Sequence, residues 1–304
     1  HSIDHNLLKL DILGHDDPTM IKALEAYISS PAMENEYNET DHPFVATDIP
    51  LDDQGVMSLF HDTSALGITP DDIGGCPVGC LGIPEFGTDF VIQMVVDTKP
   101  QTLSDLIRIS GLSHGTDVWL NNAQDLIKSD IMTYLINKGL DSEESFTIME
   151  RVRKGTVAKG KCKDWPEYKK DMLEHDVPEW YIGSCEKIKY MFPKAHAAAY
   201  VMMAYRIAYC KVNYPLAYYG AYFGIRADAF SYEIMCQGKE KLQYYIDDYT
   251  RRSDSLSKKE QDTMKDMHIV QEMYARGYEF LPIDIYRAKA TKFSIIDEKL
   301  MPPF

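Results

Sequence analysis

The chain has 304 residues, of which 45% are hydrophobic and 26% charged, and its formal net charge is -15. Such a chain buries a substantial core, so a globular protein with more than one structural unit is predicted. The negative charge argues against a protein whose whole surface grips DNA, because phosphate binding draws on clustered lysines and arginines.

The longest apolar stretches, such as 197–203, are too short and too interrupted by polar residues to span a bilayer. No apolar segment near residue 1 resembles a signal peptide, so we expect a cytoplasmic protein without membrane contact. Six scattered cysteines are typical of reduced structural thiols and predict no disulfides. Cys76 and Cys80 have the spacing of half a zinc site, but no second pair lies at a matching distance, so no zinc is predicted.

The predicted elements begin with a strand over residues 7–13, where apolar and polar side chains alternate until Gly14. Apolar residues at helical spacing then predict helices over 18–27, 55–66, 88–96, 102–112, 123–138, 143–153, 193–212, 216–225, 239–248 and 258–276. Composition predicts loops over 34–52, 74–87 and 154–163, the last of them mobile, and extended segments over 278–282 and 291–296. The fold class expected is mainly α with minor β, with a domain boundary near 235–277.

The predicted strand carries the first candidate for chemistry, Asp11, with Lys9 two residues before it. A carboxylate at a strand end beside a lysine is a common way to hold a divalent metal next to phosphate, since Mg2+ prefers carboxylate oxygens and substrate phosphates. One carboxylate rarely fixes two metals. Either its partners precede this chain, or Asp11 is an ordinary strand-end residue.

The clearest predicted helix begins after Pro193 and carries Lys194 and His196 in its first turn. Free amide hydrogens and the helix dipole already favour an anion at that end, so two basic side chains there are locally unfavourable. A bound triphosphate would supply the missing negative charge. The alternative is a solvated lysine and a histidine at the edge of the core.

Three further patterns are candidates for binding. The segment 109–119 is dense in small residues that bring backbone close to a ligand, among them Ser110, Gly111, His114 and Gly115, although an ordinary loop has the same composition. A basic run comprises Arg151, Arg153, Lys154, Lys159, Lys161 and Lys163. The dipeptides His15-Asp16 and His61-Asp62 occur in helical metal phosphohydrolases, but two such pairs arise easily by chance.

Taken together, four stretches in this order resemble C-family replicative DNA polymerase III alpha subunits of the Gram-positive PolC type. They are residues 1–19 (HSIDHNLLKLDILGHDDPT), 81–88 (LGIPEFGT), 109–119 (ISGLSHGTDVW) and 192–200 (FPKAHAAAY). Further agreement at 206–209, 225–228 and 282–287 extends the resemblance over nearly the whole chain.

The resemblance implies that residues 1–15 are the C-terminal edge of a palm, 16–235 the helical fingers, and 236–304 a segment leading into a helix-hairpin-helix DNA-binding region. Asp11 would be the third palm acid, at a two-Mg2+ site completed by a Pro-Asp-x-Asp-x-Asp signature that this chain lacks. Both ends look cut from a longer protein, and the fragment alone is expected to be inactive.

The resemblance also assigns roles to the candidate residues. Lys194 and His196 would neutralise the triphosphate of the incoming dNTP, and Lys9 would reach a phosphate from the palm side. Ser110, Gly111, His114 and Gly115 would shape the nucleotide pocket, and the basic run would contact the template of primed DNA. The other partners implied are the remainder of the polymerase and, through regions outside this chain, the sliding clamp and its loader. The rival interpretation is a non-catalytic helical module that binds a protein partner.

Overall fold

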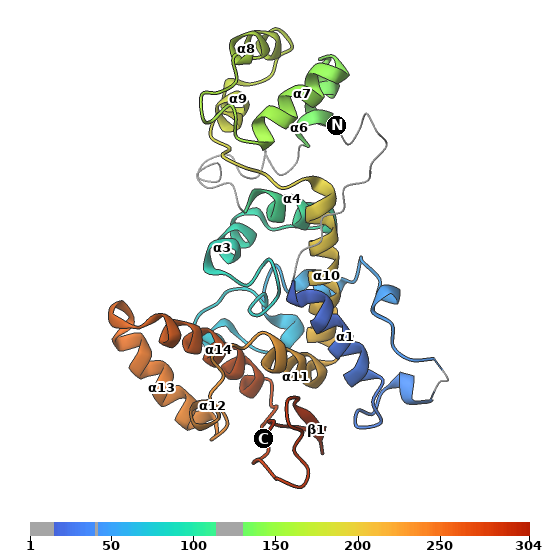
Figure 1. Ribbon diagram of the computed structural model, residues 1–304, viewed down its shortest axis with the longest axis vertical. Coiled ribbons are helices and arrows are strands. Elements are labelled where there is room, and N and C mark those ends of the chain that lie inside the picture. Colours follow the sequence, from blue (N-terminus) through green and yellow to red (C-terminus); the bar gives the residue numbers. More distant parts are fainter. Residues whose placement is uncertain (1–14, 40–41, 114–129) are drawn as a thin grey trace.

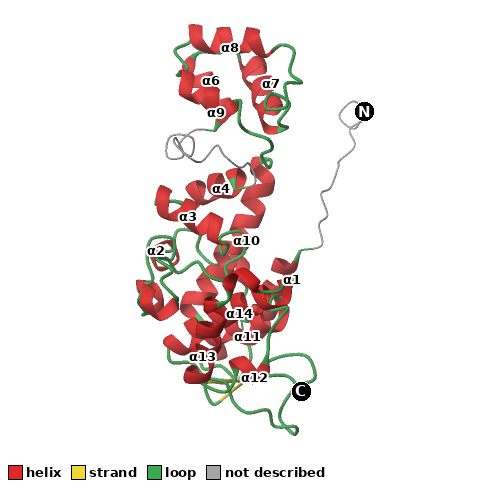
Figure 2. Ribbon diagram, turned by 90° about the vertical axis from the view of Figure 1, so that its left-hand side faces the viewer, coloured by secondary structure: helices red, strands yellow, loops and turns green. Residues whose placement is uncertain are grey.

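The computed structural model describes residues 15–39, 42–113 and 130–304. These residues form an elongated, mostly helical body with one small two-stranded sheet near the C-terminal end (Figures 1 and 2). The expected fold class, mainly α with minor β, is therefore confirmed. The strand predicted over 7–13 lies outside the described residues. No helix in the described ranges is both long and apolar enough to cross a membrane.

One long helix, α10 (Lys194–Asn213), runs through the middle of the body (Figure 1). Its 20 residues, uninterrupted by glycine or proline, give a rod of about 30 Å. Apolar side chains such as Val201 and Ile207 are fully buried, so the helix forms part of the core. Its neighbours are α1 (Asp16–Ile28), α2 (Gln54–Ser58), α4 (Leu103–Leu112) and α11 (Pro215–Ile225).

The segment before α4 is irregular. A helix was predicted over 55–66, but α2 ends at Ser58 and the chain then turns, because the Asp62 carboxylate accepts hydrogen bonds from the backbone and hydroxyl of Ser64. The predicted helix at 88–96 is confirmed as α3 (Asp89–Thr98), and a reciprocal Thr102–Asp105 cap starts α4. Short 3-10 turns are η1 (Glu36–Glu39), η2 (Ala46–Asp48), η3 (Ser64–Leu66) and η4 (Pro70–Ile73).

A cluster of four helices lies beyond the N-terminal end of α10 (Figures 1 and 2). The Asp141 carboxylate accepts hydrogen bonds from the amides of Glu143 and Glu144, so Asp141 caps the second of these helices. Two of the four were not predicted: one consists mostly of polar and charged residues, and the other has only seven residues. The cluster comprises α6 (Ile131–Lys138), α7 (Ser142–Arg153), α8 (Trp165–Glu174) and α9 (Glu179–Cys185).

The other end of the body holds the last helices and the sheet. A Ser257–Glu260 capping box starts the longest of these helices, which packs beside α13. Strands β1 and β2 are antiparallel, with Ser294 opposite Met301, and Asp297 and Glu298 form their tight turn. The elements are α12 (Tyr232–Met235), α13 (Lys239–Arg251), η5 (Ser253–Ser255), α14 (Lys258–Ala275), β1 (Ser294–Ile296) and β2 (Lys299–Met301).

The glycine-containing turn after α7, predicted as a mobile loop, is held by a series of backbone hydrogen bonds, such as Lys161 N to Thr156 O at 2.8 Å. Gly155 has a left-handed φ of 66°, and a Cβ built there would lie 1.9 Å from the carbonyl oxygen of Lys189. Gly160 has a similar φ of 64°, but a Cβ there would meet nothing within 4 Å.

These two glycines make a matched pair for measurement. We expect Gly155→Ala to lower the local free energy of unfolding by at least about 3 kcal/mol, because backbone strain and a backbone clash add together. Gly160→Ala should cost only about 1 kcal/mol, because it adds strain alone. Amide hydrogen exchange of the turn measures both values. Equal costs for the two variants would show that the close approach to Lys189 is absent.

Candidate functional site

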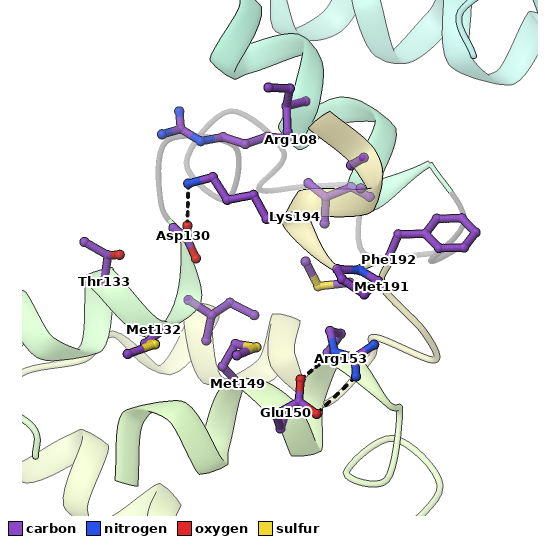
Figure 3. Close-up of a pocket in the computed structure, with 16 residues that line it drawn as sticks. Arg108, Asp130, Met132, Thr133, Met149, Glu150, Arg153, Met191, Phe192 and Lys194 are labelled. Carbon is purple, nitrogen blue, oxygen red and sulfur yellow. Dashed lines mark hydrogen bonds and ion pairs between the residues drawn. The ribbon is translucent and has the colours of Figure 1, made fainter. Parts of the chain in front are cut away.

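A cavity of about 310 Å³ lies where the N-terminus of α10 meets α4, α6 and α7 (Figure 3). Apolar side chains, such as Met132, Met149 and Met191, form much of its wall. Charged side chains stand among them, namely Arg108, Asp130, Glu150, Arg153 and Lys194. The charged set carries three cations and two carboxylates, so the cavity favours an anionic or zwitterionic occupant.

The first turn of α10 forms one rim of this cavity. The residue before it, Pro193, provides no side-chain cap, and the turn contains no acidic residue, so the positive end of a 20-residue helix is left without an anion from its own turn. The Lys194 ammonium instead lies 2.8 Å from the Asp130 carboxylate (Figure 3). Asp130 precedes α6 but makes no capping hydrogen bond there, because its carboxylate is turned to the lysine.

Two arginines stand on other walls of the cavity. Arg153 makes a bidentate contact of 2.7 and 3.1 Å to Glu150, and with Lys154 it lowers the pKa of Glu150 to about 2. Arg108 has a long contact of 3.3 Å to Asp105, and its Nε is buried without a hydrogen-bond partner among the described residues. Sequence reasoning missed Arg108, because a lone arginine in a helix carries no motif.

The second predicted phosphate ligand, His196, lies on a different side of α10. Residues two apart on a helix do not face each other, and His196 is not among the residues that line the cavity. Its ring stacks on Phe192 at 4.5 Å and lies 4.4 Å from the ring of Tyr200. Tyr200 in turn lies 4.7 Å from His15, so four rings form a continuous row. Phe192 belongs both to this row and to the cavity wall.

His15, at the end of the ring row, belongs to a polar network around the buried carboxylate of Asp17. Its Nδ1 lies 2.9 Å from Asp17, and the other Asp17 oxygen is 2.7 Å from Arg226 at the end of α11. Burial raises the pKa of Asp17, although His15 and Arg226 oppose that shift. The network therefore ties the start of α1 to α11 and holds His15 against α10.

The small-residue segment divides between two environments. Gly111 lines the cavity, where a Cβ would meet nothing within 4 Å, so the glycine leaves open space. Ser110 is buried and its hydroxyl donates to Glu85 at 3.0 Å, outside the cavity lining. His114, Gly115, Lys9 and Asp11 lie outside the described residues.

The basic run divides into side chains that pair with Glu150 and side chains that are exposed. Arg153 and Lys154 share the Glu150 carboxylate. The other four side chains of the run are exposed, namely Arg151, Lys159, Lys161 and Lys163.

Among residues 15–39, 42–113 and 130–304, no three His, Cys, Asp or Glu side chains gather in a way that could hold a metal. The Cys76 thiol donates to Val78 O and the Cys80 thiol to Leu59 O, and all six cysteines are free. His61 contacts the carbonyl oxygen of Pro100 and takes no part in the network of His15, Asp17 and Arg226. The described residues therefore offer no support for a metal phosphohydrolase.

Comparison with known protein families first identifies the class of protein. Residues 17–133 match the family model described as the bacterial DNA polymerase III alpha subunit finger domain. This match covers α1 to the start of α6, and so includes Arg108, Gly111 and Asp130 of the cavity wall.

The whole chain then matches one type of that polymerase. It is 49% identical to the DNA polymerase III PolC-type of Caldanaerobacter subterraneus subsp. tengcongensis, 50% to that of Streptococcus pneumoniae serotype 2, and 49% to that of Oceanobacillus iheyensis. The chain belongs to the PolC-type DNA polymerase III family, and it spans 21% of the length of these relatives. The resemblance inferred from the sequence motifs is confirmed.

Proposed function

We propose that this chain provides much of the nucleotide-binding fingers region of a DNA-directed DNA polymerase, with the incoming triphosphate bound at the N-terminus of α10. The observation that carries the proposal is the positive end of this helix, which has no capping side chain or acid in its first turn and opens on a cavity with three cations. Relatives at about 50% identity are named DNA polymerase III.

The Lys194–Asp130 pair fits a site that exchanges one anion for another. The two side chains are 64% and 33% exposed, so their attraction is screened and is worth at most about 1 kcal/mol. A triphosphate carries several negative charges and also reaches the free amides of the first turn. It therefore displaces Asp130 from Lys194, and Arg108 supplies a second donor from α4.

The metal chemistry in this proposal depends on Asp11, with further carboxylates from outside this chain. Two Mg2+ ions, when bound, activate the primer 3'-hydroxyl and stabilise the pyrophosphate leaving group. Asp11 precedes His15 by four residues, a length of chain that spans at most about 14 Å. His15 contacts Tyr200, and Tyr200 contacts His196, so the first described residue of the chain lies at the ring row on α10.

The remaining assignments are part of the same proposal. Residues 16–235 act as fingers, 1–15 as the palm edge, and 236–304 lead toward further DNA-binding elements. His196 orients the nucleotide from the ring row, while Gly111, with Ser110, His114 and Gly115, shapes its surroundings. Lys9 reaches a phosphate from the palm side. Primed template contacts the exposed side chains Arg151, Lys159, Lys161 and Lys163. The clamp and its loader bind parts of the polymerase outside this chain.

Kinetics of the full-length polymerase test the phosphate site. We expect Lys194→Ala to lower kcat/KM for the nucleotide by about 10- to 100-fold, the range for a lost charge-assisted hydrogen bond. Asp130→Asn should instead leave KM unchanged or lower it, because it releases Lys194 from its competitor. Lys170→Ala, on exposed α8, is the matched control and should change nothing. Unchanged kinetics for Lys194→Ala would remove this lysine from the site.

A further inference from the structure

A second surface, at the far end of the molecule from the cavity, has the features of a nucleic-acid contact. Residues 285–292, called here the cationic loop, contain Arg287, Lys289 and Lys292. No acidic residue occurs from 285 to 296, although the chain as a whole has a formal net charge of -15. All three basic side chains are exposed, and the closest carboxylate contact, Arg287 to Asp297, is a long 3.6 Å.

The loop also presents an aromatic ring to solvent. Tyr286 is 92% exposed and its neighbour Ile285 64% exposed. Among the described residues, the tyrosine with the next highest exposed fraction is Tyr244 on α13, at 63%. Acidic residues such as Asp247 follow Tyr244 in sequence. An exposed ring flanked by cations and free of acids is the combination that stacks on bases and neutralises phosphates.

The backbone holds the loop in a defined shape. The Asp284 carboxylate accepts from the amide of Tyr286 at 2.9 Å, and the Asp284 carbonyl accepts from Arg287 and Ala288. At its far end, the Lys289 carbonyl accepts from Phe304 N at 3.0 Å. Asp284 is therefore engaged within the turn that displays Tyr286, so the ring is presented on an ordered support with little loss of conformational entropy on binding.

We propose that the cationic loop binds single-stranded DNA, with a base stacked on Tyr286 and phosphates at Arg287, Lys289 and Lys292. The inference rests on the proposed polymerase function and deepens it by adding a contact to the strand beyond the nucleotide site. The length of α10, about 30 Å, separates the cavity from the end of the molecule that carries the loop (Figure 1). Only a template with a long single-stranded portion reaches both the cavity and the cationic loop.

The test measures binding of full-length polymerase to primed templates that differ only in their single-stranded overhang. With an overhang of roughly 20 nucleotides, longer than one stacking platform covers, Tyr286→Ala should weaken binding about 5- to 100-fold. The triple variant Arg287→Glu, Lys289→Glu, Lys292→Glu should also weaken it and reduce the slope of log affinity against log salt by about 2. With an overhang of two nucleotides, both variants should bind like the parent protein.

Matched controls come from α13, where Tyr244→Ala and the pair Lys239→Glu, Lys241→Glu change side chains that are also exposed, and these variants should leave binding intact. Unchanged affinity of Tyr286→Ala for the long overhang overturns the proposal. An equal loss on both templates overturns it too, because the loop would then contact duplex or the rest of the polymerase. Nucleotide KM, measured on the short template, responds to Lys194→Ala but not to the loop variants, so failure of this inference is distinct from failure of the proposed function.

Discussion

Replacing Lys211 with methionine is expected to destabilise the helical body by about 3–5 kcal/mol, the cost of removing one partner from a buried ion pair. Lys211 and Glu272 are both fully buried and lie 2.9 Å apart. The Lys211 ammonium also donates to the carbonyls of Gly79 and Leu81, at 2.8 and 2.6 Å. Methionine fills the space but leaves both carbonyls and the Glu272 carboxylate without their cation.

This pair connects three parts of the fold. Glu272 belongs to α14, Lys211 to α10, and the two carbonyls to the glycine-rich segment that leads to Glu85. Tyr219 of α11 donates to the other Glu272 oxygen at 2.8 Å. Since Glu85 in turn accepts from Ser110 of α4, loss of Lys211 should loosen the chain up to the cavity wall.

A double-mutant cycle of Lys211→Met and Glu272→Gln separates the interaction energy of the pair from the contributions of its surroundings. Glu272→Gln keeps the size of the side chain but leaves a buried cation, so we expect a loss of about 2–3 kcal/mol at neutral pH. Burial lowers the pKa of Lys211, and removing the carboxylate should lower it further. The unfolded chain then binds more protons than the folded one, so the stability of Glu272→Gln should rise with pH until the lysine of the unfolded chain also titrates, at about pH 10.

Hydrogen exchange of α10 and α14 peptides in the full-length polymerase measures these values without requiring two-state unfolding of a large protein. The control is Lys258→Met, at an exposed position in the first turn of α14, which should cost at most about 0.5 kcal/mol. Protection in Lys211→Met equal to the parent would contradict the buried pair.

The helical scaffold was predictable wherever a long run of local signals agreed. The segment 193–212 has a proline at its start, no internal glycine or proline, and apolar side chains at helical spacing, and it forms α10 within one residue at each end. Helix α7 was equally clear, because apolar spacing predicts a helix over 143–153 and the structure has one over Ser142–Arg153. Helices α8 and α9 gave no such pattern, since α8 consists mostly of polar and charged residues and α9 has only seven residues.

The long-range polar contacts were not predictable from local patterns. Nothing in the sequence around Lys211 pairs it with a glutamate 61 positions later, because that contact depends on how α14 packs on α10. The same holds for Asp130, which meets Lys194 across 64 positions. The first turn of α10 was predicted to be an anion site from the residues alone, but the structure separates Lys194, on the cavity rim, from His196, in the ring row.

Asp11→Asn should nearly abolish nucleotide incorporation by the full-length polymerase, with kcat reduced roughly 10³-fold or more, because a neutral side chain no longer anchors the metal that stabilises transition-state charge. Asp16→Asn is the matched control: Asp16 is an exposed acid on the first turn of α1, five positions away, and its replacement should leave kcat unchanged.

Kinetic constants distinguish the proposed role of Asp11 from that of Lys194, the proposed phosphate ligand. Lys194→Ala removes a contact to the bound nucleotide and should raise KM, whereas Asp11→Asn should lower kcat while affinity for primed DNA stays intact. Raising the Mg2+ or Mn2+ concentration should partly restore Asp11→Asn but not Lys194→Ala, because only the first variant weakens metal binding. Full activity of Asp11→Asn would exclude this residue from the metal cluster. The ring row from His15 to Phe192 would then position the nucleotide without marking where the palm carboxylates lie.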